Sequence, residues 1–231
     1  MSRRVAFVTG SARGIGRAIV DALAPTHDVI GVDVLAAEAD APGRHLRADL
    51  SDPAECARLV DHVGQVDVLV NNAAILIHKP IPEFTLEDFD RTLAVNLRAP
   101  FLLSQALVPR MAERGWGRMV TVSSVGARTG GVSQSCVYNA TKAALISMTK
   151  NFARNYGPSG VTANAVAPGA VDTAMTAHIS ADEHDSYQAQ IPLRRFSEPT
   201  EVAAVVAFLA SDAASYVTGA TVDVNGGWLM T

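Results

Sequence analysis

The sequence predicts an α/β fold: a single domain with a doubly wound, seven-stranded parallel sheet and helices on both of its faces. Three observations predict it. Short runs rich in β-branched residues alternate with helical stretches along the whole chain, which is typical of consecutive βαβ units. Several of these runs are apolar throughout, as strands buried on both faces are. Finally, 231 residues with 48% hydrophobic side chains suffice for one large core.

Strands are predicted over residues 5–9, 29–32, 44–48, 66–70, 118–123, 161–166 and 221–224. Helices are predicted over residues 15–24, 53–63, 86–113, 136–156 and 199–210. Residues 34–43 are too few for a crossover helix, so we expect a loop there. Residues 174–197 are polar and lack periodicity, and a connection of that length is often an active-site lid. The whole chain, 1–231, is thus predicted to be one dinucleotide-binding and catalytic domain with a substrate lid near 174–197.

The charge balance and the cysteines narrow the class of protein. A formal net charge of −4 gives no basic surface for neutralising phosphates, so nucleic-acid binding is not expected. No apolar run approaches the roughly eighteen residues of a membrane span. Cys56 and Cys136 lie far apart and form neither a metal-type cluster nor a disulfide framework. We therefore expect a cytoplasmic protein without a metal site that acts on a small molecule.

A glycine-rich turn follows the first predicted strand. Residues 9–16 read T-G-S-A-R-G-I-G, with the spacing G-x3-G-x-G rather than G-x-G-x-x-G, and a predicted helix follows. Glycines let the backbone turn sharply and approach a pyrophosphate, and the helix N-terminus presents free N–H groups to it. The turn predicts a Rossmann-type dinucleotide site whose phosphate-binding residues are Gly10, Arg13, Gly14, Ile15 and Gly16.

Asp33 follows the second predicted strand, where dinucleotide folds place an acid beside the adenosine ribose. Its carboxylate can accept hydrogen bonds from both ribose hydroxyls and repel the 2′-phosphate of NADP. Arg13 instead favours NADP, because a guanidinium in the glycine turn can pair with a phosphate. We weigh Asp33 more heavily, since no Lys or Arg follows it before Arg44, and predict NAD rather than NADP.

Tyr138 and Lys142 are four residues apart on a predicted helix and therefore share a face. For Tyr138 to act as a base near pH 7, its pKa must fall by about 3 units from about 10, which costs roughly 4 kcal/mol. We expect the ammonium of Lys142, together with an oxidised nicotinamide, to supply this. Ser124 follows a predicted strand and can reach the same crevice. Asn96 interrupts an apolar run, an unusual place for an amide without partners.

Together these motifs resemble the short-chain dehydrogenase/reductase family over nearly the whole chain. The motifs are the glycine turn, Asp49-Leu50, Asn71-Asn72-Ala73-Ala74, Asn96, Ser124, Tyr138-x3-Lys142, Pro168-Gly169-x-Val171-x-Thr173 and Asn225-Gly226-Gly227. Three departures from the family pattern are Ala74 in place of Gly, Asn225 in place of Asp, and a Ser124 to Tyr138 interval one residue longer than usual. None of them removes a chemical group that the reaction needs.

The resemblance implies roles for several residues. Asp49 and Leu50 would contact the adenine, and Asn71 and Ala73 would flank the ribose. Val171 and Thr173 would hold the nicotinamide amide, and Tyr138 and Lys142 would also bind the cofactor. Lys142 would bond the nicotinamide ribose, and Asn96 would anchor a water in the proton relay. The resemblance further implies a homotetramer formed through the helices near 86–113 and 136–156 and the C-terminal strand.

We therefore predict an oxidoreductase that transfers a hydride between NAD(H) and a secondary alcohol or ketone, with Tyr138 as the general acid or base. Three alternatives stay open: a 3-oxoacyl-thioester reductase using NADP(H), a sugar or polyol dehydrogenase, and a non-catalytic dinucleotide-binding regulator. A nucleotide-sugar epimerase or dehydratase is disfavoured because too little chain follows Arg195 for a further substrate region.

The substrate side of the predicted site is mainly apolar. Its expected wall consists of Ile75, Leu76, Ile77, Val125, Cys136 and the lid, which favours an apolar or ring-shaped substrate. Arg128, Arg194, Arg195 and His78 are candidates for receiving a substrate carboxylate, such as that of a cyclic dihydrodiol acid.

Overall fold

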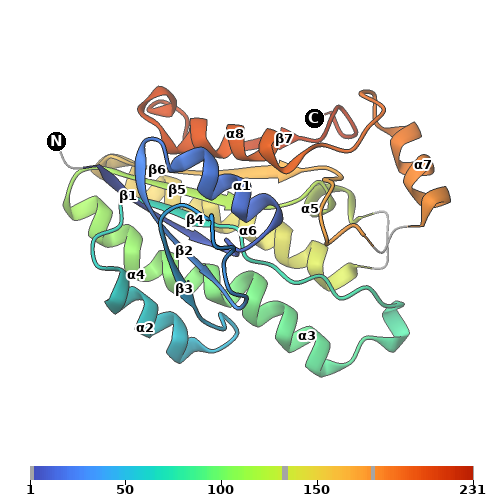
Figure 1. Ribbon diagram of the computed structural model, residues 1–231, viewed down its shortest axis with the longest axis horizontal. Helices are drawn as coiled ribbons and strands as arrows, with labels where there is room; N and C mark the ends of the chain where they lie inside the picture. Colours follow the sequence, from blue (N-terminus) through green and yellow to red (C-terminus); the bar gives the residue numbers. More distant parts are fainter. Residues whose placement is uncertain (1–2, 132–134, 178–179, 231) are drawn as a thin grey trace.

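A wholly parallel, seven-stranded sheet runs through the centre of the computed structural model, which describes residues 3–131, 135–177 and 180–230 (Figure 1). The strand order is β3-β2-β1-β4-β5-β6-β7. The strands are β1 (Arg4–Thr9), β2 (His27–Asp33), β3 (Arg44–Arg47), β4 (Val68–Asn71), β5 (Gly117–Val122), β6 (Val161–Pro168) and β7 (Thr221–Val224). The chain reverses its direction of winding between β1 and β4, and such a reversal is where doubly wound folds bind ligands. The predicted fold class is confirmed.

Helices cover both faces of this sheet. On one face lie α1 (Gly14–Leu23) and α8 (Pro199–Ala210), and on the other lie α2 (Pro53–Val63), α4 (Ala99–Glu113) and α6 (Cys136–Tyr156) (Figure 1). Successive side chains of β1 alternate between the two cores: Ala6 and Val8 belong to the core with α1 and α8, and Phe7 belongs to the other. Because both faces are covered, the central strands are apolar without interruption.

The predicted helix over 86–113 is divided in the structure. It consists of α3 (Leu86–Leu93), a π-helical stretch η2 (Ala94–Arg98) and α4. The π-helical stretch contains Asn96, whose side chain bonds the backbone of Ile75 instead of facing solvent. A π-turn within a helix often marks a functional site.

The segment 174–197 contains a helix that sequence periodicity does not reveal. Helix α7 (Ala181–Gln190) lies at the right of Figure 1 and buries none of its residues, so it has no apolar stripe. The sequence does contain one sign of this helix, the capping box at its N-terminus: the side chains of Ser180 and Glu183 each accept a hydrogen bond from the other residue's backbone N–H. Residues 178–179 of the predicted lid lie outside the described residues. Residues 34–43 form the expected loop.

One short helix and several 3₁₀ turns lie between the longer elements of the described residues. These are α5 (Gly126–Thr129) and the 3₁₀ turns η1 (Ile81–Glu83), η3 (Gly157–Ser159) and η4 (Asp212–Ala214). Within the described ranges, no helix has the length and apolarity that a membrane crossing requires. In the same part of the chain, no three His, Cys, Asp or Glu side chains are placed to hold a metal ion.

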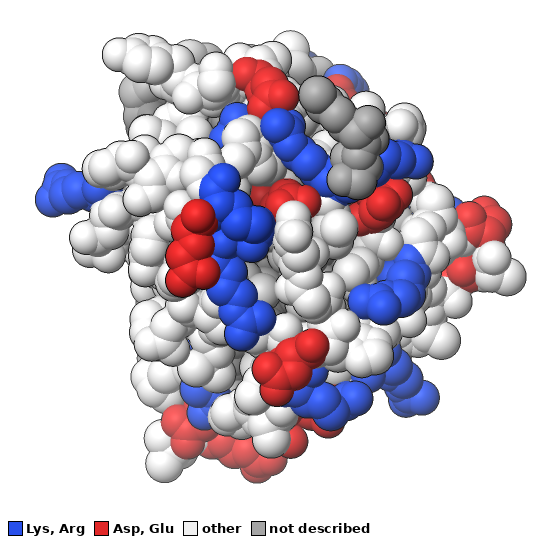
Figure 2. Space-filling view, turned by 90° about the vertical axis from the view of Figure 1, so that its left-hand side faces the viewer, with Lys and Arg blue, Asp and Glu red and all other residues white. Residues whose placement is uncertain are grey.

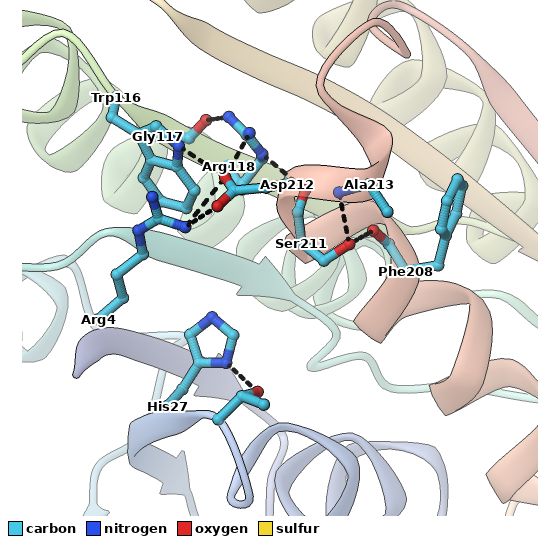
Figure 3. A network of polar contacts seen from close by, with 10 residues as sticks. Arg4, His27, Trp116, Gly117, Arg118, Phe208, Ser211, Asp212 and Ala213 are labelled. Atoms are coloured by element: carbon cyan, nitrogen blue, oxygen red, sulfur yellow. Dashed lines mark hydrogen bonds and ion pairs between the residues drawn. The ribbon is translucent and has the colours of Figure 1, made fainter.

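A cluster of arginines around Trp116 joins β1, β5 and η4 at the end of the sheet where the strands begin (Figure 3). The guanidinium carbons of Arg4 and Arg118 lie 3.6 and 4.2 Å from the centroid of the Trp116 ring. The carboxylate of Asp212 lies 2.9 Å from Arg4 Nη1 and 3.1 Å from Trp116 Nε1. Figure 2 views the molecule from this side and shows basic and acidic side chains next to one another, so the charges there are locally balanced.

Candidate active site

A pocket of about 370 Å³ opens where β1, β2, β4, β5 and β6 end. It collects the predicted site residues from distant parts of the chain, with the exception of Asn71 and Asn96. Those that line it are Gly10, Arg13, Gly14, Ile15, Gly16, Asp33, Asp49, Leu50, Ala73, Ser124, Tyr138, Lys142, Val171 and Thr173. The parallel topology is the cause, because it places all these strand ends at one edge of the sheet.

The glycine turn is held in a tight arrangement at the floor of this pocket. Gly10 has φ +68°, and a Cβ on Gly16 would lie 1.8 Å from the carbonyl oxygen of Gly10. The amide Nδ2 of Asn72 donates to the carbonyl oxygens of Thr9 and Gly10 at 2.9 and 3.1 Å. Thr9 Oγ1 accepts from the backbone N–H groups of Asn72 and Ala73 at 3.0 Å. Thr9 and Asn72 therefore fix the turn, a role that could not be predicted from their places in the motifs.

The N-terminus of α1 fits a pyrophosphate. Its N-cap residue, Arg13, has an extended backbone, and its side chain makes no capping hydrogen bond. Gly14, Ile15 and Gly16 in the first turn line the pocket. The first N–H groups of a helix need partners from outside the helix, and together with the helix dipole they favour an anion. The residues present thus suit the phosphates of a dinucleotide.

The end of the pocket beside the glycine turn contains two carboxylates, those of Asp33 and Asp49. Asp33 accepts from the backbone N–H groups of Ala12 and Leu35, each at 3.0 Å, so both carboxylate oxygens are fixed beside the glycine turn. Asp49 accepts from the N–H of Ser51 at 2.9 Å, and this bond lowers the pKa of the Asp49 carboxyl. Arg91 of α3 also lines the pocket. Arg91 was not predicted to be a site residue, because it lies on an exposed position of an amphipathic helix, where arginines are usually solvated.

Tyr138, Lys142 and Ser124 meet at the other end of the pocket. The Nζ of Lys142 lies 5.5 Å from the ring centroid of Tyr138 and donates to the carbonyl oxygen of Val122 at 2.7 Å. Ser124 lies beside the phenol of Tyr138, and its Oγ accepts from the N–H of Gly126 at 3.1 Å. The predicted convergence of these three side chains is therefore present in the structure.

The pKa values of this group differ from the sequence expectation. Burial raises the pKa of Tyr138 to about 12, which the hydrogen bond from Ser124 only partly opposes. Burial lowers the pKa of Lys142 to about 7. The lowering of the tyrosine pKa was expected from the lysine together with an oxidised nicotinamide, and it stays a prediction for the protein with bound cofactor; Lys142 alone does not produce it. The physical reason is that loss of hydration disfavours both charged forms, so the lysine ammonium that was to stabilise the phenolate is itself destabilised.

Asn96 and Asn71 lie beneath the pocket rather than in its wall. Asn96 is fully buried, and its amide accepts from the N–H of Ile75 at 2.8 Å and donates to the carbonyl of Ile75 at 2.9 Å. It also donates to Thr141 Oγ1 at 3.3 Å, and Thr141 donates to the carbonyl of Tyr138 at 2.6 Å. The expected partners of Asn96 are thus found. Asn71 instead donates to Ser104 of α4 at 3.0 Å, so its side chain is bound by the helix packed against β4 and does not line the pocket.

The predicted substrate wall is only partly correct. Ile75 is one of the predicted wall residues that line the pocket. Ala174 and Met175, at the start of the predicted lid, line it as well. Cys136 instead lines a separate, more open hollow with Pro80 and Ile81. Cys136 is exposed, whereas Cys56 is buried, and both are free thiols.

The predicted carboxylate receptors are occupied elsewhere. Arg128 pairs with Asp223 at 2.9 Å, and Arg195 pairs with Glu201 at 2.6 Å. Arg194 donates to the carbonyl oxygen of Ala189. Among the described residues that line the pocket, none of these arginines appears, and neither does His78. A carboxylate receptor at the substrate end is therefore not among the described lining residues.

This fold and pocket define the class of nicotinamide-dinucleotide-dependent oxidoreductases, and comparison with known proteins places the chain within it. A family profile described as enoyl-(acyl carrier protein) reductase matches residues 10–229. The chain is 40% identical over 240 residues to the 3-oxoacyl-[acyl-carrier-protein] reductase FabG of Aquifex aeolicus, over 97% of this chain and 96% of that protein.

Solved structures agree. The chain is similar to a blue fluorescent protein from a metagenomic library in complex with NADPH, with a TM-score of 0.90, 38% identity and coverage of 98% of both chains. It is also similar to a 3-oxoacyl (acyl-carrier-protein) reductase of Agrobacterium tumefaciens with NADP bound, with a TM-score of 0.90, 32% identity and coverage of 96% and 93%. The chain therefore belongs to the short-chain dehydrogenase/reductase family and is an NAD(P)-dependent oxidoreductase.

Proposed function

We propose that this oxidoreductase interconverts a secondary alcohol and a ketone, with NAD(H) as its preferred cofactor and Tyr138 as its proton carrier. The observation that carries the proposal is the meeting of Tyr138, Ser124 and Lys142 in the same pocket as the glycine turn. A proton-transfer group, a hydroxyl donor and a nucleotide-binding turn in one pocket are the parts that carbonyl reduction needs.

Each of the three side chains has a distinct task in reduction. When bound, the nicotinamide supplies the hydride to the carbonyl carbon. Tyr138 gives its proton to the substrate oxygen, a task that suits a phenol with a pKa raised to about 12, because it stays protonated near neutral pH. Ser124 can donate its own hydroxyl proton to the same oxygen, since its Oγ accepts from Gly126. Lys142, which lines the pocket and is fixed by its bond to Val122, would hold the nicotinamide ribose with its remaining N–H groups.

Asn96 acts through other residues. Its bonds to Ile75 and Thr141 connect the loop after β4 to the turn of α6 that carries Tyr138. We assign it a positioning role, and the π-helical stretch that contains it provides the local geometry. The water-anchoring role implied by the family resemblance stays a prediction.

The preference for NAD rests on Asp33. Both of its oxygens are fixed by backbone N–H groups at the adenosine end of the pocket, so the carboxylate cannot move away from a 2′-phosphate without losing them. The two solved relatives described above contain NADP or NADPH, and Arg13 lines this pocket as well. The proposed preference for NAD therefore rests on the fixed carboxylate of Asp33.

The substrate is proposed to be uncharged near its reacting carbon. The pocket wall contributes Ile75 and Met175 there, and the arginines predicted to receive a carboxylate have partners elsewhere. A second candidate, a 3-oxoacyl-thioester reductase using NADP(H), is favoured by the name of the Aquifex aeolicus relative. We also propose that the enzyme is cytoplasmic, which its two free cysteines support. The family resemblance supports a homotetramer.

A panel of substrates tests the proposal. Ketones and secondary alcohols of aliphatic, cyclic, polyol and hydroxy-acid type, together with acetoacetyl-CoA, are offered with NAD(H) and NADP(H) in parallel, and NAD(P)H absorbance is followed. Turnover of an uncharged ketone with NADH is expected. Faster turnover of acetoacetyl-CoA with NADPH selects the second candidate, and dinucleotide binding without turnover of any compound selects a regulator. Light scattering after size exclusion measures the oligomeric state.

A further inference from the structure

The loop that follows Asp33 is fastened to α1 by a single arginine. Residues 34–43 contain neither helix nor strand, and they begin with Val34 and Leu35, two exposed apolar residues that line the pocket. Arg17, in the second turn of α1, donates through Nη1 to Glu38 at 2.9 Å and to Asp40 at 3.2 Å. A loop that replaces a crossover helix lacks the packing of one, so these ion pairs are a substantial part of what holds it.

The same arginine is saturated with acidic partners. Its Nε donates to both oxygens of Asp21, one helical turn further along α1, at 3.0 and 3.1 Å. The side chain of Arg17 is only 17% exposed, whereas those of Glu38 and Asp40 are 70% and 79% exposed. The guanidinium therefore lies beneath the loop with three carboxylates around it, and its pKa is raised by Asp21 and Asp40.

We propose that Arg17, Glu38 and Asp40 form a clamp that contributes to cofactor discrimination. The clamp holds Val34 and Leu35 against the adenosine and keeps the charge of Arg17 neutralised, so that Arg17 does not attract the 2′-phosphate of NADP. This inference rests on the proposed function in that it takes Asp33 as the ribose-binding residue.

The physical basis is a difference in charge between the two cofactors. NAD and NADP differ by a phosphate, so selectivity depends on the sign of the charges near the ribose. A free arginine in this region would pair with that phosphate. Arg13 of the glycine turn and Arg91 of α3 line the pocket, and Arg47, whose Nε donates to the carbonyl of Val34 at 3.0 Å, lies at the base of the loop. Glu38 and Asp40 thus offset an arginine that would otherwise add to the positive charge of Arg13 and Arg91, which line the pocket.

Two variants separate the positioning effect from the charge effect. Arg17→Gln removes the clamp and leaves its acids unpaired, and the double variant Glu38→Gln with Asp40→Asn removes the clamp and leaves Arg17 with Asp21 alone. Both are expected to weaken NADH binding by about threefold to fivefold, the size of effect that exposed ion pairs produce. Their effects on selectivity have opposite signs. The double variant raises the affinity for NADPH relative to NADH by about threefold to tenfold at low ionic strength, and Arg17→Gln lowers it or leaves it unchanged.

The measurement is fluorescence titration of the purified protein with NADH and NADPH, at low and high salt, with no substrate present. Hydrogen exchange of residues 34–43 in the cofactor-free protein gives a second readout, and faster exchange is expected in both variants. Arg58→Gln is the matched control, because Arg58 pairs with Glu55 on the surface of α2 and does not line the pocket. It should change neither readout.

Three results overturn the inference: equal exchange in the loop, a selectivity shift of the same sign in both variants, or a shift in the control as large as that in the double variant. If the unmodified protein binds neither dinucleotide, the proposed function itself fails. The two failures are therefore distinguishable.

Discussion

Lys142 is predicted to make the protein more stable at alkaline pH. The residue is 2% exposed and burial lowers its pKa to about 7, against an ordinary value of 10.5. The unfolded chain keeps the lysine proton up to about pH 10.5, but the folded protein loses it above about pH 7. Between these values the unfolded state binds more protons, so the free energy of unfolding rises with pH. From pH 7 to pH 9 the gain is about 2 kcal/mol.

Replacing the lysine by methionine, Lys142→Met, removes this titration while keeping a flexible side chain of similar length. The variant leaves the carbonyl of Val122 without its donor, which costs about 1 kcal/mol at every pH and does not alter the slope. Urea unfolding of the cofactor-free protein, followed by circular dichroism at pH 7, 8 and 9, measures the slope. Cys56, whose pKa is raised by burial, lowers stability as the unfolded thiol ionises near the upper limit, and it does so equally in the unmodified protein and in the variants, so the difference between their slopes is unaffected.

The matched control is Lys150→Met, since Lys150 is exposed on the same helix. Lys150→Met should keep the same dependence of the free energy of unfolding on pH as the unmodified protein. In Lys142→Met the increase in this free energy from pH 7 to pH 9 should be smaller by about 2 kcal/mol. Equal slopes in all three proteins would refute the reasoning, because Lys142 would then titrate as a solvated lysine does.

Three further predictions concern the pocket and the opposite end of the sheet. Tyr138→Phe should reduce kcat by about 100-fold to 10,000-fold with unchanged NADH binding, and turnover near that of the unmodified protein would contradict its role. Asp33→Asn should reduce the preference for NADH over NADPH by about tenfold in fluorescence titrations, because it removes the charge facing the 2′-phosphate; an unchanged ratio argues against Asp33. Asp212→Asn should lower the free energy of unfolding by about 1–2 kcal/mol in urea, since Arg118 is 3% exposed and Asp212 is its ion-pair partner at 3.4 Å. The exposed Asp61→Asn should have no effect.

Features that depend on local pattern were predictable from the sequence. The strands were found because both of their faces are buried, which makes runs such as residues 5–9 apolar throughout. The glycine turn was found because its backbone geometry demands residues without a Cβ. The topology then brought Ser124 and Tyr138 together without any further signal from the sequence.

Features that depend on three-dimensional surroundings were not predictable. Helix α7 buries no residue, so hydrophobic periodicity carries no trace of it. Asn71 bonds Ser104 of α4 and does not line the pocket, and a strand buried on both faces gives no alternation from which the direction of its side chain could be predicted. The partners of Arg128 and Arg195 lie on other elements or turns, so the sequence alone left them as candidate substrate ligands.

The pKa shifts are the most instructive case, because one cause acts on two residues with opposite results. Spacing on a helix indicated that Lys142 would assist ionisation of Tyr138, but spacing does not report how deeply a pair is buried. Burial raises one pKa to about 12 and lowers the other to about 7, so that near neutral pH the tyrosine keeps its proton while the lysine is close to its titration midpoint. The same burial makes Lys142 costly to the folded state at and below neutral pH, which is why the stability measurement on Lys142→Met also tests the electrostatic basis of the proposed chemistry.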